Sequence, residues 1–180
     1  ILKLKQNLST SLRRTPSIKT TSLTIQSLNL TPQRAFFEPM ILNIDTLSDV
    51  SLPELTRTFN TAFNDYLVRL QFSEEQMLQK LKMENVQMSL SYGAFHQNEL
   101  VAFILHAVDV YYYPGCVYNA GTGVIPGYRG QRIIEKIYEV AMKELHHKGF
   151  SRLSLEVAIA NKRAYTIYRH MGFCEDRELI

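Results

Sequence analysis

The segment Gly121–Ile134 reads GTGVIPGYRGQRII, and it decides the fold prediction. A strand-like stretch that begins at Val117 leads into it, glycines punctuate it, and an amphipathic helical pattern follows it. A strand-to-helix junction of this kind offers free backbone N–H groups and the positive end of a helix dipole, which suits a phosphate. The spacing GxxxxGK[ST] is absent, and Pro126 stands where GxGxxG needs its last glycine. The segment therefore predicts a phosphate-binding turn outside the ATPase and dinucleotide-binding classes.

Hydrophobic patterns on both sides of this turn predict alternating strands and helices. We expect a strand at 40–44, a helix from 51 to about 64 and a second one from 73, strands at 89–95, 99–110 and 117–125, a helix at 131–147, a strand at 152–158, a short helix from 161 and a strand from 173. This order is β-α-α-β-β-β-α-β-α-β. It predicts an α/β fold on a mixed sheet with helices on both faces.

Residues 1–39 differ in composition from the rest of the chain. They hold six basic residues and one acidic residue, so their net charge is +5. The whole chain has a net charge of +3, so the remaining residues are slightly acidic. Eleven serines and threonines are scattered through it, and its leucines keep no sustained period. We expect a disordered or non-native leader over 1–39 and one folded domain over 40–180. A targeting peptide and an ordered segment are the alternatives.

Composition argues against several functional classes. Hydrophobic residues make up 46% of the chain, which is enough for a buried core. The longest apolar run, Leu100–Leu105, is far too short to cross a membrane. Residues 40–180 are slightly acidic, which gives no case for nucleic-acid binding, and the histidines lack metal-ligand spacing. With only Cys116 and Cys174, we expect a reducing, cytoplasmic compartment rather than a disulfide scaffold.

Two segments carry a resemblance to a known family. Val124–Ile134 reads VIPGYRGQRII, and Asn161–Phe173 reads NKRAYTIYRHMGF. They resemble the two signatures of the GNAT N-acetyltransferase superfamily, [QR]-x-x-G-x-[GA] after Val-x-Pro, and N-x-x-A-x-x-x-Y-x-x-x-G-F. The expected element order from Met40 onward is also similar to that family's. The resemblance implies an acyl-CoA N-acyltransferase-like fold, acetyl-CoA as cosubstrate, and an amine of a small molecule or peptide as acceptor. It leaves a homodimer open.

The resemblance also implies roles for individual residues. Backbone amides from Arg129 to Ile134 would hold the pyrophosphate of coenzyme A, and the strand end Thr122–Val124 would pair with the pantetheine arm. Tyr168 would protonate the departing thiolate after direct attack by the amine. The implied cofactor-binding residues are Thr122, Val124, Arg129, Gly130, Gln131, Arg132, Ile133, Ile134 and Asn161.

Four further residues are weaker candidates. Glu156 lies in a strand expected beside the cofactor, and it is a candidate general base for the amine. Asp65, at the end of the first expected helix, is a candidate for attracting a cationic amine. His106 and Asp109 are candidates for a proton relay, with a structural role as the alternative for each.

The sequence departs from the family pattern in three ways. Arg132 and Ile134 replace the small residues of the loop, where a side chain crowds the cofactor or needs a backbone conformation that glycine tolerates better. A non-catalytic acyl-CoA-binding module, or an interaction module on the same fold, is therefore the alternative to an enzyme. The family's fold also continues to a seventh strand. We expect the last strands to be truncated at Ile180, or the sheet to close otherwise.

Overall fold

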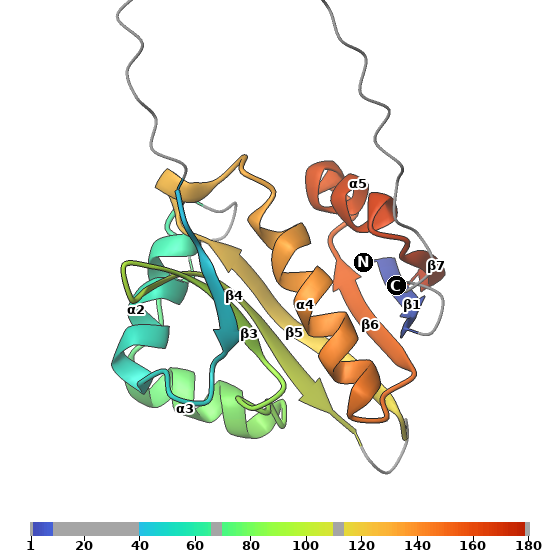
Figure 1. Cartoon of the computed structure of the whole chain (residues 1–180), viewed down its shortest axis with the longest axis horizontal. Coiled ribbons are helices and arrows are strands. Elements are labelled where there is room, and N and C mark those ends of the chain that lie inside the picture. The colour runs from blue at the N-terminus through green and yellow to red at the C-terminus, as the bar shows by residue number, and fades with distance from the viewer. Residues whose placement is uncertain (1, 9–39, 66–69, 110–113, 179–180) are drawn as a thin grey trace, which may run out of the picture.

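The computed structural model describes residues 2–8, 40–65, 70–109 and 114–178 (Figure 1). Its strands are β1 (Leu2–Asn7), β2 (Asn43–Thr46), β3 (Tyr92–His96), β4 (Glu99–Val108), β5 (Cys116–Val124), β6 (Arg152–Val157) and β7 (Cys174–Glu178). Its helices are α2 (Leu52–Ala62), α3 (Glu74–Met83), α4 (Ile133–His147) and α5 (Lys162–His170), with a short 3-10 turn at Pro126–Tyr128. From β2 to β7 the order is β-α-α-β-β-β-α-β-α-β, as the sequence predicts.

The strands form one mixed sheet in the spatial order β2-β3-β4-β5-β6-β1-β7. Neighbouring strands pair antiparallel, except β5 and β6, which pair parallel. A parallel pair needs a long crossover, and α4 provides it between β5 and β6. The α/β fold class on a mixed sheet is therefore confirmed.

Local sequence signals determine where the helices begin. The Ser51 hydroxyl accepts a hydrogen bond from the Glu54 amide at 3.3 Å and caps α2. Ser73 and Gln76 form a complete capping box at the start of α3. Such caps satisfy amides that the first helical turn leaves without a partner. No helix among the described residues is long and apolar enough to span a membrane.

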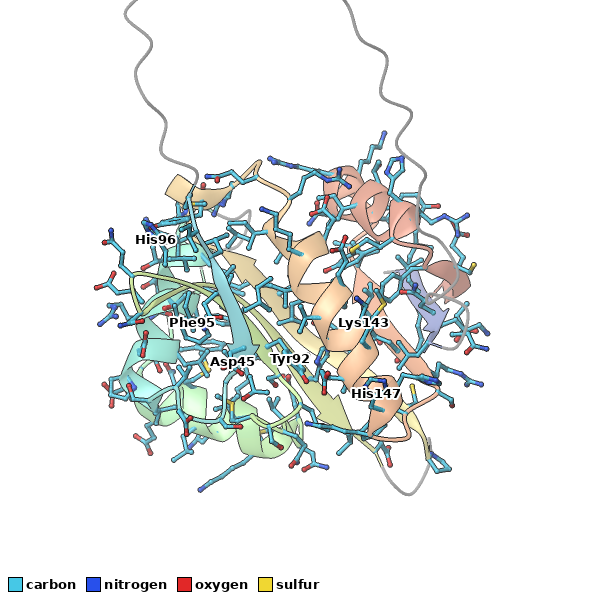
Figure 2. All side chains as sticks on the ribbon, viewed as in Figure 1. Asp45, Tyr92, Phe95, His96, Lys143 and His147 are labelled. Atoms are coloured by element: carbon cyan, nitrogen blue, oxygen red, sulfur yellow. The ribbon has the colours of Figure 1, made fainter. Side chains whose placement is uncertain are left out.

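Two apolar clusters cover opposite faces of the sheet. One cluster joins α4 and α5 to residues such as Ile104, and the other joins α2 and α3 to Phe103 and Leu105. Side chains of successive strand residues point to opposite faces, so β4 contributes to both clusters and is almost entirely buried. Figure 2 shows Lys143 and His147 on the outward side of α4, which lies in front of the sheet.

The N-terminal strand β1 is the main difference from the expected architecture. It lies between β6 and β7 and pairs antiparallel with both of them. Leu4 and Leu8 are 0% and 1% exposed, within the cluster that contains α4. The expectation of a disordered leader is therefore wrong for residues 2–8, while residues 9–39 lie outside the described residues. The start of the chain therefore supplies one of the seven strands among the described residues, and the C-terminal strand β7 forms the edge of the sheet next to it.

Candidate active site

A cleft opens where β5 and β6 separate. The two strands pair only as far as Asn119 and Leu155, although β5 continues to Val124 and β6 to Val157. A bulge in β5, opposite Leu105 and His106 of β4, lies at the point of separation. The cleft has a volume of about 670 Å³ and is lined by both strand ends, the turn before α4, and α5. Ten of the eleven residues implied by the resemblance, or proposed as base, line it; Gln131 does not.

The open edge of β5 presents backbone groups to this cleft. The Ile125 amide donates to the Val101 carbonyl of β4 at 3.0 Å. Because backbone groups alternate between the two edges of a strand, those of Thr122 and Val124 face the separated β6. An extended chain can add to such an edge by hydrogen bonding. The Val124 carbonyl already accepts the Arg129 Nε–H at 3.1 Å, so Thr122 and the Val124 amide form the available part of this edge.

The N-terminus of α4 points its amides into the cleft. The first intrahelical bond runs from the Lys136 amide to the Arg132 carbonyl, and the side chain of Arg132, the N-cap residue, does not cap the helix. The amides of Ile133, Ile134 and Glu135 therefore have no partner within the helix, which is the arrangement that binds anions. The amide of Arg129 is engaged, because it donates to the Pro126 carbonyl at 3.2 Å. The expectation that the amide cradle begins at Arg129 is corrected on this point.

Arg132 has the left-handed backbone conformation that its glycine-like position requires, with φ 57° and ψ 32°. A residue with a Cβ is disfavoured in this region, by about 1 kcal/mol or somewhat more. Its side chain is 80% exposed and lies 3.3 Å from Glu135, so it leaves the helix N-terminus uncovered. The replacement of glycine by Arg132 therefore strains the local backbone, but it leaves the amides at the N-terminus of α4 accessible.

The variant Arg132→Gly is expected to raise the free energy of unfolding by about 1 kcal/mol, since glycine adopts a positive φ without the Cβ clash. Arg132→Ala is the matched control, because it removes the same ion pair with Glu135 and keeps the Cβ. Urea unfolding of the three proteins measures the difference. Equal stabilisation by both substitutions would contradict backbone strain as the cause.

The side chain of Arg129 ties three elements together at the edge of the cleft. It forms two hydrogen bonds with the Asp65 carboxylate, at 2.6 and 2.8 Å, and donates to the Ala62 carbonyl at 2.8 Å. The bonds to Val124 and Ala62 link the end of β5 to the end of α2. The hydrogen bond to Arg129 lowers the pKa of Asp65. Asp65 is therefore engaged by Arg129, contrary to its expected role as an attractor of cationic amines.

Tyr168 enters the cleft from α5, and Glu156 faces it from β6. Tyr168 is 8% exposed and its ring packs edge-on against Tyr138 and Phe173. Glu156 is exposed, and with Glu84 it adds to the effect of burial in raising the pKa of Tyr118 to about 12. The phenol of Tyr168 and the carboxyl group of Glu156 therefore line the same opening.

Asn161 caps a helix at the cleft, and His106 lies in the core. The Asn161 side chain accepts the Ala164 amide at 3.1 Å and caps α5 at the cleft wall. His106 is fully buried, outside the cleft lining, and its Nδ1 is 2.7 Å from the Leu90 carbonyl. Burial lowers the pKa of His106 to about 4, so this ring is neutral near pH 7. A proton relay to the cleft through His106 is not supported. Asp109 also lies outside the cleft lining.

Sequence reasoning missed Tyr138, which is fully buried behind the cleft and hydrogen-bonded to Asn119. It lies on the apolar stripe of α4 beside Ile137 and Ala141, where a tyrosine is normally part of the core. The available signal was the polar hydroxyl itself, since a buried phenol requires a hydrogen-bond partner. Among the described residues, no group of three or more His, Cys, Asp and Glu side chains converges as a metal site would require.

The sheet order, the separated strands β5 and β6 and the open N-terminus of α4 match an acyl-CoA N-acyltransferase-like fold. The model of the acetyltransferase (GNAT) family matches residues 52–173. The chain therefore belongs to the GNAT acetyltransferase family.

Relatives within this family are distant. N-alpha-acetyltransferase 30 of Schizosaccharomyces pombe is 29% identical over 62 residues, which are 34% of this chain and 41% of that protein. The match thus spans less than half of either chain. The ribosomal-protein-S18-alanine N-acetyltransferase of Escherichia coli superposes with a TM-score of 0.61 at 21% identity, over 76% of this chain and 80% of the other. A chain of the NatC complex bound to Gag peptide and CoA superposes with a TM-score of 0.61 at 20% identity. The match covers 77% of this chain and 87% of that chain. Identities this low show the shared fold alone.

Proposed function

We propose that this protein transfers the acetyl group of acetyl-CoA to a primary amine of a small molecule or a peptide. The observation that carries the proposal is the cleft itself, in which an unpaired strand edge leads to an uncapped helix N-terminus. An extended pantetheine arm fits the first feature and a pyrophosphate fits the second. Structural relatives that acetylate amines or bind CoA support the same assignment.

The residues of the cleft divide the work of binding. The amides of Gly130 to Ile134, with those of the first helical turn, hold the pyrophosphate. The backbone of Thr122 and the amide of Val124 pair with the pantetheine arm. Asn161, at the start of α5, contacts the cofactor from the opposite wall. Acetyl-CoA supplies an activated thioester, and the enzyme forms no covalent intermediate with it.

Two side chains handle the protons of the transfer. Glu156 accepts a proton from the attacking amine, through a water molecule where the distance requires one. Tyr168 returns a proton to the sulfur of the departing thiolate. Backbone amides along the open edge of β5 stabilise the negative charge that develops on the thioester oxygen. The free thiols of Cys116 and Cys174 support a reducing, cytoplasmic setting as part of this proposal.

A thiol-release assay with acetyl-CoA tests the proposal. The purified chain is incubated with a panel of small polyamines, aminoglycosides and peptides with free N-termini, and products are identified by mass. We expect an amine-dependent release of CoA with a mass increase of one acetyl group on the acceptor. Binding of acetyl-CoA without release of CoA for any amine would favour the non-catalytic acyl-CoA-binding module. That alternative arises because Arg132 and Ile134 replace the small residues of the loop.

A further inference from the structure

A buried hydrogen-bond network lies directly behind Tyr168. Asn119 of β5 donates from Nδ2 to the Tyr138 hydroxyl oxygen at 2.6 Å and to the Thr122 hydroxyl at 2.7 Å. Its Oδ1 accepts the Gly121 amide at 2.8 Å within the β5 bulge. Tyr138 is 0% exposed and Asn119 is 7% exposed. The network thus connects the open strand of the cleft to the core side of α4.

The hydrogen bonds of this network have a defined direction. The Gly121 amide can only donate, so it fixes Oδ1 of Asn119 toward itself and Nδ2 toward the two hydroxyls. The hydroxyls of Thr122 and Tyr168 also interact with that of Tyr138. The Tyr138 oxygen accepts from Asn119 and Thr122, so its own O–H points to the remaining partner, the oxygen of Tyr168. The edge-on packing of the Tyr138 and Tyr168 rings, 6.2 Å between centroids, agrees with this contact.

We propose that Tyr138 is a positioning residue for Tyr168, and that its hydroxyl donates a hydrogen bond to the Tyr168 oxygen when Tyr168 gives its proton to the thiolate. This inference rests on the proposed function of Tyr168. In the transfer step the O–H bond of Tyr168 breaks and an S–H bond forms, leaving a phenolate on Tyr168. The Tyr138 hydroxyl keeps its proton and stabilises that phenolate, and Asn119 and Thr122 hold the hydroxyl in this orientation.

The surroundings of Tyr138 favour the protonated form of its hydroxyl, which is the form that can donate a hydrogen bond. Burial, followed by the charge of Tyr168, raises the pKa of Tyr138 well above its ordinary value. His106 of β4 faces its ring, with centroids 6.3 Å apart, and the pKa of this histidine is about 4. The uncharged ring of Phe173 packs against Tyr138, and the carboxyl group of Glu156 lines the same cleft as Tyr168. Tyr138 therefore remains a donor throughout the pH range in which the enzyme would work.

The variant Tyr138→Phe removes this donor and keeps the ring. We expect kcat to fall about tenfold with the KM for acetyl-CoA unchanged, the loss typical of one buried hydrogen bond. In the Tyr168→Phe background the same substitution should have no further effect on kcat, because the two hydroxyls act as a unit. Tyr165→Phe is the matched control. It removes another hydroxyl of α5, one that binds Glu175 outside the cleft, and should leave kcat unchanged.

A second measurement does not depend on turnover. Tyrosine labelled with 13C at Cζ reports the ionisation of Tyr168 by NMR, with Tyr168→Phe identifying its signal. Tyr138→Phe is expected to move the midpoint of this ionisation about one pH unit upward, since the phenolate loses a donor. Thr122→Val, which removes one support of Tyr138 and keeps the side-chain shape, should move the midpoint in the same direction by less.

The outcomes separate this inference from the proposed function. If the wild-type chain turns over and Tyr168→Phe does not, but Tyr138→Phe changes neither kcat nor the titration of Tyr168, the positioning role of Tyr138 is overturned and the enzyme stands. If no amine is acetylated and the titration midpoint still moves, the hydrogen bond exists and the proposed function fails. A fall in kcat with an unmoved midpoint would assign to Tyr138 a packing role only.

Discussion

Tyr168→Phe is expected to lower kcat for acetyl transfer about a hundredfold and to leave the affinity for acetyl-CoA within about twofold of wild type. A positioned general acid typically contributes at least this factor, and phenylalanine keeps the ring that packs against Tyr138 and Phe173. Initial rates of thiol release give kcat, and calorimetric titration with acetyl-CoA gives the affinity.

The same prediction can be tested through the pH dependence of kcat. The wild-type acid can act only while it holds its proton, and it holds that proton more fully as the pH falls, so the loss of kcat in the variant should be most visible at low pH. An unchanged kcat over the whole pH range would remove Tyr168 from the mechanism. A lost affinity for acetyl-CoA would instead mean that the hydroxyl serves binding.

Leu4→Ala is expected to lower the free energy of unfolding by about 3 kcal/mol, because it leaves a cavity in the cluster that contains α4. Leu4 is fully buried between β6 and β7, so the prediction tests whether the start of the chain belongs to the sheet. Leu78→Ala, the same change at a position of α3 that is 39% exposed, is the matched control and should cost less than about 1 kcal/mol. Urea unfolding measures both. Equal small effects would mean that β1 does not pack as described.

The strands and helices from β2 to β7 could be predicted because each has a local signal. Ser51 and Ser73 mark helix starts, and the nearly continuous apolar run of β4 marks a central strand. The strand β1 lacks comparable support. Leu2–Lys5 does alternate between apolar and charged residues, but over only four positions. Its partners β6 and β7 lie at the other end of the chain, so nothing nearby in the sequence fixes its place or register.

The same limit applies to the candidate site. The motif residues, except Gln131, line one cleft, and they could be predicted because the two signatures contain them. The pairing of Arg129 with Asp65, 64 positions apart, depends on how α2 packs against the end of β5. The contact of Tyr138 with Asn119 likewise depends on the β5 bulge and on the packing of α4. Long-range contacts of polar side chains carry no periodic signal in a single sequence.

The central claim is that the cleft between β5 and β6 binds acetyl-CoA through the N-terminus of α4. It is tested most directly by following the melting temperature of the chain during titration with acetyl-CoA, with ADP and desulfo-CoA as comparison ligands. A ligand that binds only the folded state raises the melting temperature with its concentration.

The account predicts a saturable rise with acetyl-CoA, and its loss in Ile134→Asp. An acidic residue in the first turn supports the helix but repels the pyrophosphate. A well-folded wild-type chain with no shift, or an Ile134→Asp variant that binds as tightly as wild type, would contradict the claim.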